Sequence, residues 1–118
     1  MEELARTLGD TNAGDRLLAA REARRRVRVA LQRSQSHDDV QRWESLQVLQ
    51  DADLFLAPAC IHALQVANTA AVCAVVLGRL ETAAAEAPLQ ALVEAGGRGQ
   101  RQAAAALLRV RAAQATAS

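Results

Sequence analysis

The residues with the clearest capacity for binding chemistry are arginines crowded into one short segment, REARRRVRV. On a helix, Arg21, Arg25 and Arg28 fall on a common face at spacings of four and three, with Arg24 on its border. The planar guanidinium group pairs well with carboxylates and with phosphates. The stripe therefore predicts an anionic partner, and among binding partners an acidic protein surface is the first expectation.

The same arginines allow two other interpretations. Each could contact a phosphate of RNA or DNA, and such binding would weaken steeply with added salt. No aromatic residue interleaves with the arginines, so base stacking is not available to them. The stripe could also be a merely solvated face, balanced by Asp15 and Glu22. The sequence leaves these three interpretations open.

Trp43 is the second candidate contact residue. The chain has 118 residues but only one Trp, one Phe and no Tyr, so Ala, Leu and Val must fill most of its interior. A lone large aromatic side chain buries much area and is often an anchor. We expect Trp43 to anchor either the core next to its own helix or the surface where a partner docks.

No motif in the sequence assembles a catalytic site. There is no G-x-S-x-G and no H-E-x-x-H, and GGRG at Gly96 to Gly99 lacks the strand before it and the Lys after it that a phosphate-binding loop needs. The acidic group HDD, at 37–39, is explained by a helix N-terminus, which favours negative charge. We therefore predict a protein that is not an enzyme and has no metal site and no cofactor.

Composition and charge limit the partners and the cellular compartment that we expect for this protein. A net charge of +1 gives no global attraction to nucleic acid or to anionic membranes. Cys60 and Cys73 form neither a C-x-x-C motif nor a metal-binding spacing, which predicts reduced, buried thiols in an intracellular, cytoplasmic protein. The apolar run from Leu54 to Gly78 contains Pro58 and several polar residues, so we expect a buried element and no membrane span.

Residues that typically start or end helices recur along the chain, whereas the alternating apolar and polar pattern of strands is scarce. A first clear helix follows the capping candidates Asp10, Thr11, Asn12 and Asp15. A second follows Ser36 or Asp38 and places Val40, Trp43, Leu46 and Leu49 three residues apart. Further helices are expected over residues 58–67, 70–85, 89–95 and 100–114. The sequence thus predicts a single all-α domain over residues 1–118 with five or six helices, and with frayed ends at 1–12 and 114–118.

Two consecutive segments follow the same plan. They are DDVQRWESLQVLQDADLFLAPACIHALQVA and NTAAVCAVVLGRLETAAAEAPLQALVEAGG, and their prolines, Pro58 and Pro88, lie 30 residues apart. The segment RGQRQAAAALLRV restarts the first half of that plan. Over Asp38 to Val110 the chain resembles the short HEAT-type and armadillo-like repeats. This resemblance implies stacked helical hairpins that serve as a scaffold for other proteins, although a compact bundle of five or six helices fits the same pattern.

Two further resemblances give alternatives. The run HALQVANTAAVCAVVLGRLE is similar in outline to the phosphorylated helix of histidine phosphotransfer bundles, with His62 as the acceptor, although Gln65 stands where a Lys is usual. The run from Leu54 to Gly78 resembles one turn of the β-helix in tubulin-folding cofactor C-like proteins. We expect instead a non-enzymatic interaction or scaffold subunit of a larger assembly, with a nucleic-acid-associated subunit as the first alternative. Self-association stays open as well.

Overall fold

The chain folds into α-helices joined by short turns. The computed structural model describes residues 1–117, and no strand occurs in them. The elements are α1 (Glu2–Leu8), α2 (Ala13–Arg33), α3 (Asp39–Asp51), the π-helix η1 (Ala52–Leu56), α4 (Ala57–Ala63), α5 (Ala67–Leu80), the 3-10 helix η2 (Ala83–Ala85), α6 (Glu86–Ala95) and α7 (Gln100–Ala117). Because η1 joins α3 to α4 without a break, these elements form six rods. The predicted all-α fold is confirmed, and the β-helix interpretation is wrong.

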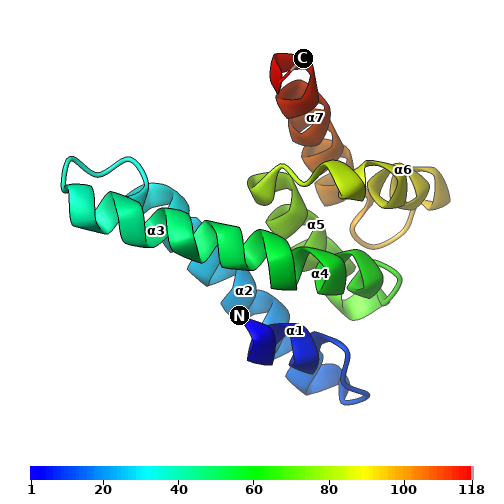
Figure 1. Ribbon diagram of the computed structural model, residues 1–118. Helices are drawn as coiled ribbons and strands as arrows, with labels where there is room; N and C mark the ends of the chain where they lie inside the picture. Colours follow the sequence, from blue (N-terminus) through cyan, green and yellow to red (C-terminus); the bar gives the residue numbers. More distant parts are fainter. Residues whose placement is uncertain (118) are drawn as a thin grey trace.

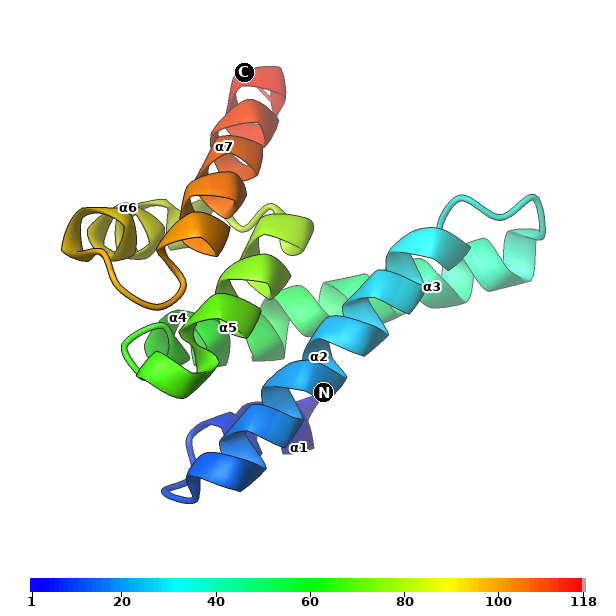
Figure 2. The same cartoon turned by 180° about the vertical axis from the view of Figure 1, so that it is seen from behind.

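The rods are arranged around α2 and α5. Helix α2 packs against α1, α3 and α5, while α5 also packs against α4 and α7, and α7 packs against α6. The α2–α3 pair projects from one side of the molecule and α7 projects from another (Figures 1 and 2). The described chain measures 42 × 34 × 18 Å, so it is thin in one direction. A thin arrangement leaves long helix faces in contact with solvent.

The core is built from small and medium side chains, as the composition predicts. One cluster of buried side chains draws on every α-helix except α3, and Leu49 of α3 packs against that cluster. Its largest fully buried members include Val27, Leu56, Leu77 and Leu89. Small residues also let two helices touch at backbone level, because a Cβ placed on Gly78 of α5 would lie 2.8 Å from Cα of Ala106 on α7. The two helices therefore cross at this pair of residues.

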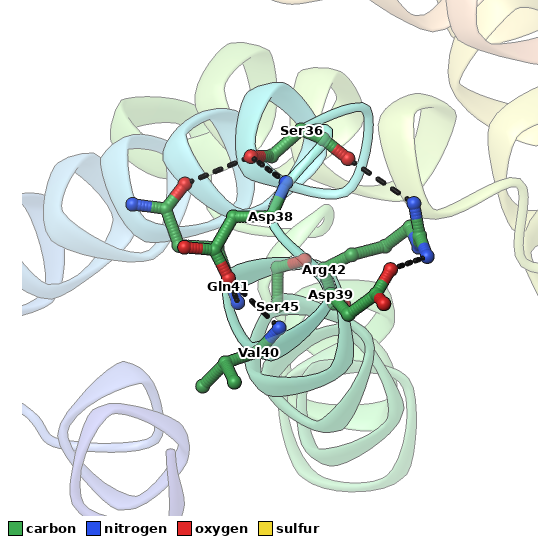
Figure 3. A network of polar contacts seen from close by, with 7 residues as sticks. All are labelled: Ser36, Asp38, Asp39, Val40, Gln41, Arg42 and Ser45. Atoms are coloured by element: carbon green, nitrogen blue, oxygen red, sulfur yellow. Dashed lines mark hydrogen bonds and ion pairs between the residues drawn. The ribbon is translucent and has the colours of Figure 1, made fainter.

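Side-chain caps fix where α2 and α3 begin. Oδ1 of Asn12 accepts a hydrogen bond of 3.0 Å from the backbone N–H of Asp15. Oδ1 of Asp38 accepts hydrogen bonds of 2.9 Å and 3.2 Å from the N–H groups of Val40 and Gln41 (Figure 3). Such bonds satisfy N–H groups that have no partner within the helix. Both residues were among the predicted caps.

Further hydrogen bonds close the turn between α2 and α3. Oγ of Ser36 accepts from the N–H of Asp38 at 3.1 Å, and the Ser36 carbonyl accepts from the guanidinium of Arg42 at 3.3 Å (Figure 3). Arg42 also forms an ion pair with Asp39. Oγ of Ser45 donates to the carbonyl of Arg42 at 2.8 Å. This network fixes the direction in which α3 leaves the turn.

Helices run close to both ends of the described chain. Fraying was expected over residues 1–12, but Glu2–Leu8 form α1, in which Leu8 is buried and Leu4 packs against the core. Leu4 and Leu8 are four residues apart, so they share one face of the helix, and that face contacts the core. At the other end α7 continues to Ala117, through most of the segment 114–118 that was expected to fray. Residue 118 lies outside the described residues.

The structure does not confirm a HEAT-type repeat. In the first of the two similar segments, α3 runs through η1 into α4 along one continuous rod and does not fold back as a hairpin (Figure 1). Pro58 lies in the first turn of α4. Its ring cannot donate a backbone hydrogen bond and crowds the carbonyl of the preceding turn, and the wider π-turn just before it relieves that crowding. In the second segment, α6 packs against η2 and α7.

Candidate interaction surfaces

The arginine stripe on α2 has the predicted geometry. Arg21, Arg25 and Arg28 are exposed, and Arg24 is half-buried at the edge of the helix that faces α5. Leu18 extends the exposed face toward the start of the helix, with 65% of its surface accessible. The stripe is therefore a basic face with one apolar side chain at its end.

Only part of this charge is balanced within the chain. Nε of Arg25 donates to Oε2 of Glu22 at 2.9 Å, and Nε of Arg26 donates to Oε1 of the same carboxylate at 3.0 Å. The hydrogen bonds from Arg25 and then Arg26 lower the pKa of Glu22 to about 2. Across residues 1–117, the guanidinium groups of Arg21, Arg24 and Arg28 form no hydrogen bond or ion pair. Glu22 thus balances Arg25 and leaves the rest of the predicted stripe unpaired.

Trp43 lies on the surface. Its side chain is 63% exposed, and Val40 and Leu46 on the same helix are 64% and 47% exposed. Of the four apolar residues spaced three apart, which are Val40, Trp43, Leu46 and Leu49, only Leu49 packs against the core. Helix α3 instead turns the small residue Ser45 inward, and Ser45 is 3% exposed. The expectation that Trp43 anchors the core is wrong, and its alternative role as a surface anchor stays a prediction.

We name the outward apolar residues of this rod the α3 stripe: Val40, Trp43, Leu46 and Leu54, with Leu54 contributed by η1. Leu54 is 66% exposed, and the exposed side chains of Gln47 and Gln50 lie between the apolar members. Acidic residues surround the stripe. Between residues 38 and 53 the chain carries five acids and a single arginine, so this region has a net charge of four negative units; the acids are Asp38, Asp39, Glu44, Asp51 and Asp53.

The arginine stripe and the α3 stripe face different directions. Trp43 and Ser45 are two residues apart, which separates them by about 200° around a helix. Ser45 is buried and lines a cavity between α3 and α2 together with Ala30, whereas Trp43 is exposed, so Trp43 points away from α2. The sequence grouped Arg21, Arg24, Arg25, Arg28 and Trp43 as one set of partner-binding residues, whereas the structure places the tryptophan and the arginines on two surfaces.

A further basic group was missed by the sequence interpretation. Arg79 lies in the last turn of α5, and burial lowers its pKa, as do the nearby charges of Arg28, Arg24 and Arg109. Nη1 of Arg79 is buried and has no hydrogen-bond partner. We call these residues the four-arginine cluster: Arg24, Arg28, Arg79 and Arg109. The sequence contains one signal for this cluster, which is the position of Arg79 inside the most apolar helix. No neighbouring residue in the sequence indicates that Arg109 belongs to it.

The remaining reactive side chains do not assemble with one another. His62 is exposed on α4, and its side chain makes no hydrogen bond or ion pair with any described residue. Cys60 and Cys73 are free and buried, as predicted. A hydrogen bond with Cys73, together with burial, raises the pKa of the Cys60 thiol. Over residues 1–117, no three His, Cys, Asp or Glu residues are grouped in a way that would hold a metal ion.

Two findings concern the whole described chain. Among the helices of residues 1–117, none is both long enough and apolar enough to cross a membrane. Comparison with protein families, with curated proteins and with solved structures gave no match. The candidate surfaces therefore have to be judged by their own chemistry.

Proposed function

We propose that this protein is a non-enzymatic helical interaction subunit that docks a protein partner on the α3 stripe. The observation that carries this proposal is the exposure of Trp43, which is the single Trp of the chain and is 63% accessible. Val40 and Leu46 lie next to it on the same helix face and are similarly exposed. Exposed apolar side chains gathered into one patch are typical of interaction sites.

The energetics favour a protein surface as the partner. A tryptophan that becomes fully buried at an interface often carries a large share of the binding free energy. Gln47 and Gln50, which lie between the apolar members of the stripe, can form hydrogen bonds within such an interface. Because the net charge of the region from Asp38 to Asp53 is four negative units, the matching partner surface is apolar at its centre and basic at its rim.

The arginine stripe supplies a second contact face in this proposal. Arg21 and Arg28 are exposed and unpaired within residues 1–117, which supports the predicted contact with an acidic protein surface. Arg25 contributes less, because Glu22 already occupies its guanidinium group. The histidine phosphotransfer alternative receives support only from the exposure of His62, which lies on a helix of seven residues.

A site-specific crosslinking experiment tests docking on the α3 stripe. The photo-crosslinking amino acid p-benzoylphenylalanine replaces Gln47, which is exposed one turn after Trp43 on the same helix face. The matched control carries the same group at Arg101, an exposed residue of α7. Irradiation of the cells that produce the protein, followed by mass spectrometry, then identifies any captured chain.

The proposal predicts a defined adduct at position 47 that is absent at position 101 and disappears when Trp43→Ala is added. An adduct of doubled chain mass would identify a second copy of this protein as the partner. Equal capture at both positions, or capture that persists in Trp43→Ala, would contradict docking on the α3 stripe. Circular dichroism of purified Trp43→Ala checks that the variant keeps its helices, which is expected for an exposed side chain.

A further inference from the structure

The four-arginine cluster brings together charges from three helices that are far apart in the sequence. Arg24 and Arg28 lie on α2, Arg79 on α5 and Arg109 on α7. Helix α5 packs against both other helices, and it begins beside the start of α2, because Nδ2 of Asn68 donates a hydrogen bond of 3.0 Å to the carbonyl of Ala13. Arg79 and Arg24 each follow that contact by the same number of residues along their helices. The crossing of Gly78 with Ala106 places Arg79 one residue and Arg109 three residues from the closest contact of α5 with α7.

These charges have no partner within the described chain. None of the four guanidinium groups makes an ion pair or a hydrogen bond with another residue of 1–117, and the acidic partners that are in use contact other arginines. Nη1 of Arg79 is in addition shielded from solvent. The C-terminal end of α5 favours a cation and offsets part of the repulsion. A buried donor without a partner costs free energy. The Arg79 side chain as a whole is only half-buried, so its remaining N–H groups can meet an anion.

We propose that the four-arginine cluster is a binding site for an oxyanion of the phosphate class that carries more than one negative charge. Each guanidinium presents five N–H donors in a fixed fork, which matches the oxygens of a phosphate group. Four positive charges from three helices exceed what one carboxylate can balance. Linked phosphates can satisfy several forks at once. This site uses none of the residues of the α3 stripe and is therefore independent of the docking proposed there, whereas it shares Arg24 and Arg28 with the arginine stripe.

The first test measures binding of sodium tripolyphosphate to the full chain by isothermal titration calorimetry at about 50 mM salt, where electrostatic binding is strong. Arg79→Gln and Arg109→Gln are expected to raise Kd about tenfold each, because each variant removes charge-assisted hydrogen bonds. Arg101→Gln is the matched control, since it removes the same charge from an exposed position near the start of α7. Its Kd should stay close to that of the unmodified protein.

A second arm identifies the source of the phosphates. A fluorescein-labelled RNA oligonucleotide is titrated with the same variants, and anisotropy is followed at several salt concentrations. If nucleic acid is the ligand, the salt dependence of log Kd should fall by about one unit for each arginine removed from the cluster. Tight binding of tripolyphosphate without RNA binding would support a small polyphosphate ligand.

Two controls separate this site from folding and from the α3 stripe. Arg79→Gln is expected to keep or raise the thermal midpoint in anion-free buffer, because it removes a shielded and unpaired charge. Trp43→Ala should bind tripolyphosphate with unchanged affinity. Absence of binding to both probes, or an equal loss in Arg101→Gln, would overturn the proposal.

Discussion

Replacing Gly78 by Ala tests the contact that joins α5 to α7. The added Cβ would lie 2.8 Å from both Cα and Cβ of Ala106, whereas carbon atoms pack best at about 3.5–4.0 Å. One of the two clashing atoms belongs to the backbone, so a rotamer change cannot relieve the overlap. Overpacking of this kind costs about 1–3 kcal/mol. Ala is favoured over Gly within a helix by about 1 kcal/mol, which offsets part of that cost.

Subtracting this offset from the overpacking cost leaves about 0–2 kcal/mol. Because the clash involves a backbone atom, we expect Gly78→Ala to lower the free energy of unfolding by an amount in the upper half of that range, about 1–2 kcal/mol. The assay is urea unfolding followed by circular dichroism, read as a shift of the midpoint at constant slope. Gly9→Ala is the control, because its new Cβ would meet nothing closer than the Arg6 carbonyl at 3.5 Å and Gly9 has an ordinary φ of −88°. A Gly78→Ala protein more stable than the unmodified chain would refute the close crossing, because the helix preference of Ala would then act without a steric cost.

The double variant with Ala106→Gly sharpens this prediction. Removing the Cβ of Ala106 eliminates one of the two close contacts and leaves the one with Cα. The two substitutions should therefore couple, with part of the stability lost in Gly78→Ala restored once the intrinsic cost of Gly at position 106 is subtracted. Simple additivity would indicate that the two residues do not touch.

Two other predictions concern the cap of α3 and the buried thiols. Asp38→Ala should destabilise the protein by about 1 kcal/mol in the same urea assay, because two backbone N–H groups lose their acceptor. Asp39→Ala removes an exposed ion pair and an acidic charge in the first turn of α3 but no capping hydrogen bond, so it should cost less. Equal losses in the two variants would contradict the capping role. The pKa of Cys60 is raised in the folded state, so its proton is held more tightly there than in the unfolded chain. Stability from this thiol is full below the unfolded pKa of about 8.5 and falls as the pH rises above it, so the thermal midpoint should drop at alkaline pH and drop less in Cys60→Ala. An identical pH dependence in both proteins would contradict this assignment.

Local signals in the sequence were enough to predict most helices. Asn12 and Asp38 cap α2 and α3, as short polar side chains before an apolar run predict. The continuity of α3 and α4 could not be predicted in the same way. Pro58 reads as a break, and only the π-turn of η1 allows the rod to continue past it. Helix α1 was not predicted, because its residues Leu4 and Leu8 are held by contacts with helices that are distant in the sequence.

The parts of the candidate sites whose residues are close together in the sequence could be predicted, and the other parts could not. Arg21, Arg24, Arg25 and Arg28 lie within one helix, so helical periodicity alone places them on neighbouring faces. The direction of Trp43 was not predictable, because α3 has apolar residues on both sides and the sequence does not say which side meets α2. Arg79 and Arg109 join the basic residues of α2 only through tertiary packing. No spacing in the sequence indicates that these arginines come close together.

The π-helix η1 also sets the rotational phase between the two ends of the α3–α4 rod. A π-turn holds more residues than an α-turn, so the side chains that follow it are rotated relative to those before it. If the same residues 52–56 took α-helical geometry with none removed, α3 would be rotated by about 100° about its axis relative to α4. Val40, Trp43 and Leu46 would then no longer point directly away from α2, and Ser45 would leave its buried position. The face that this protein offers to a partner is thus determined by the pitch of a single turn, one that contains none of Val40, Trp43 and Leu46.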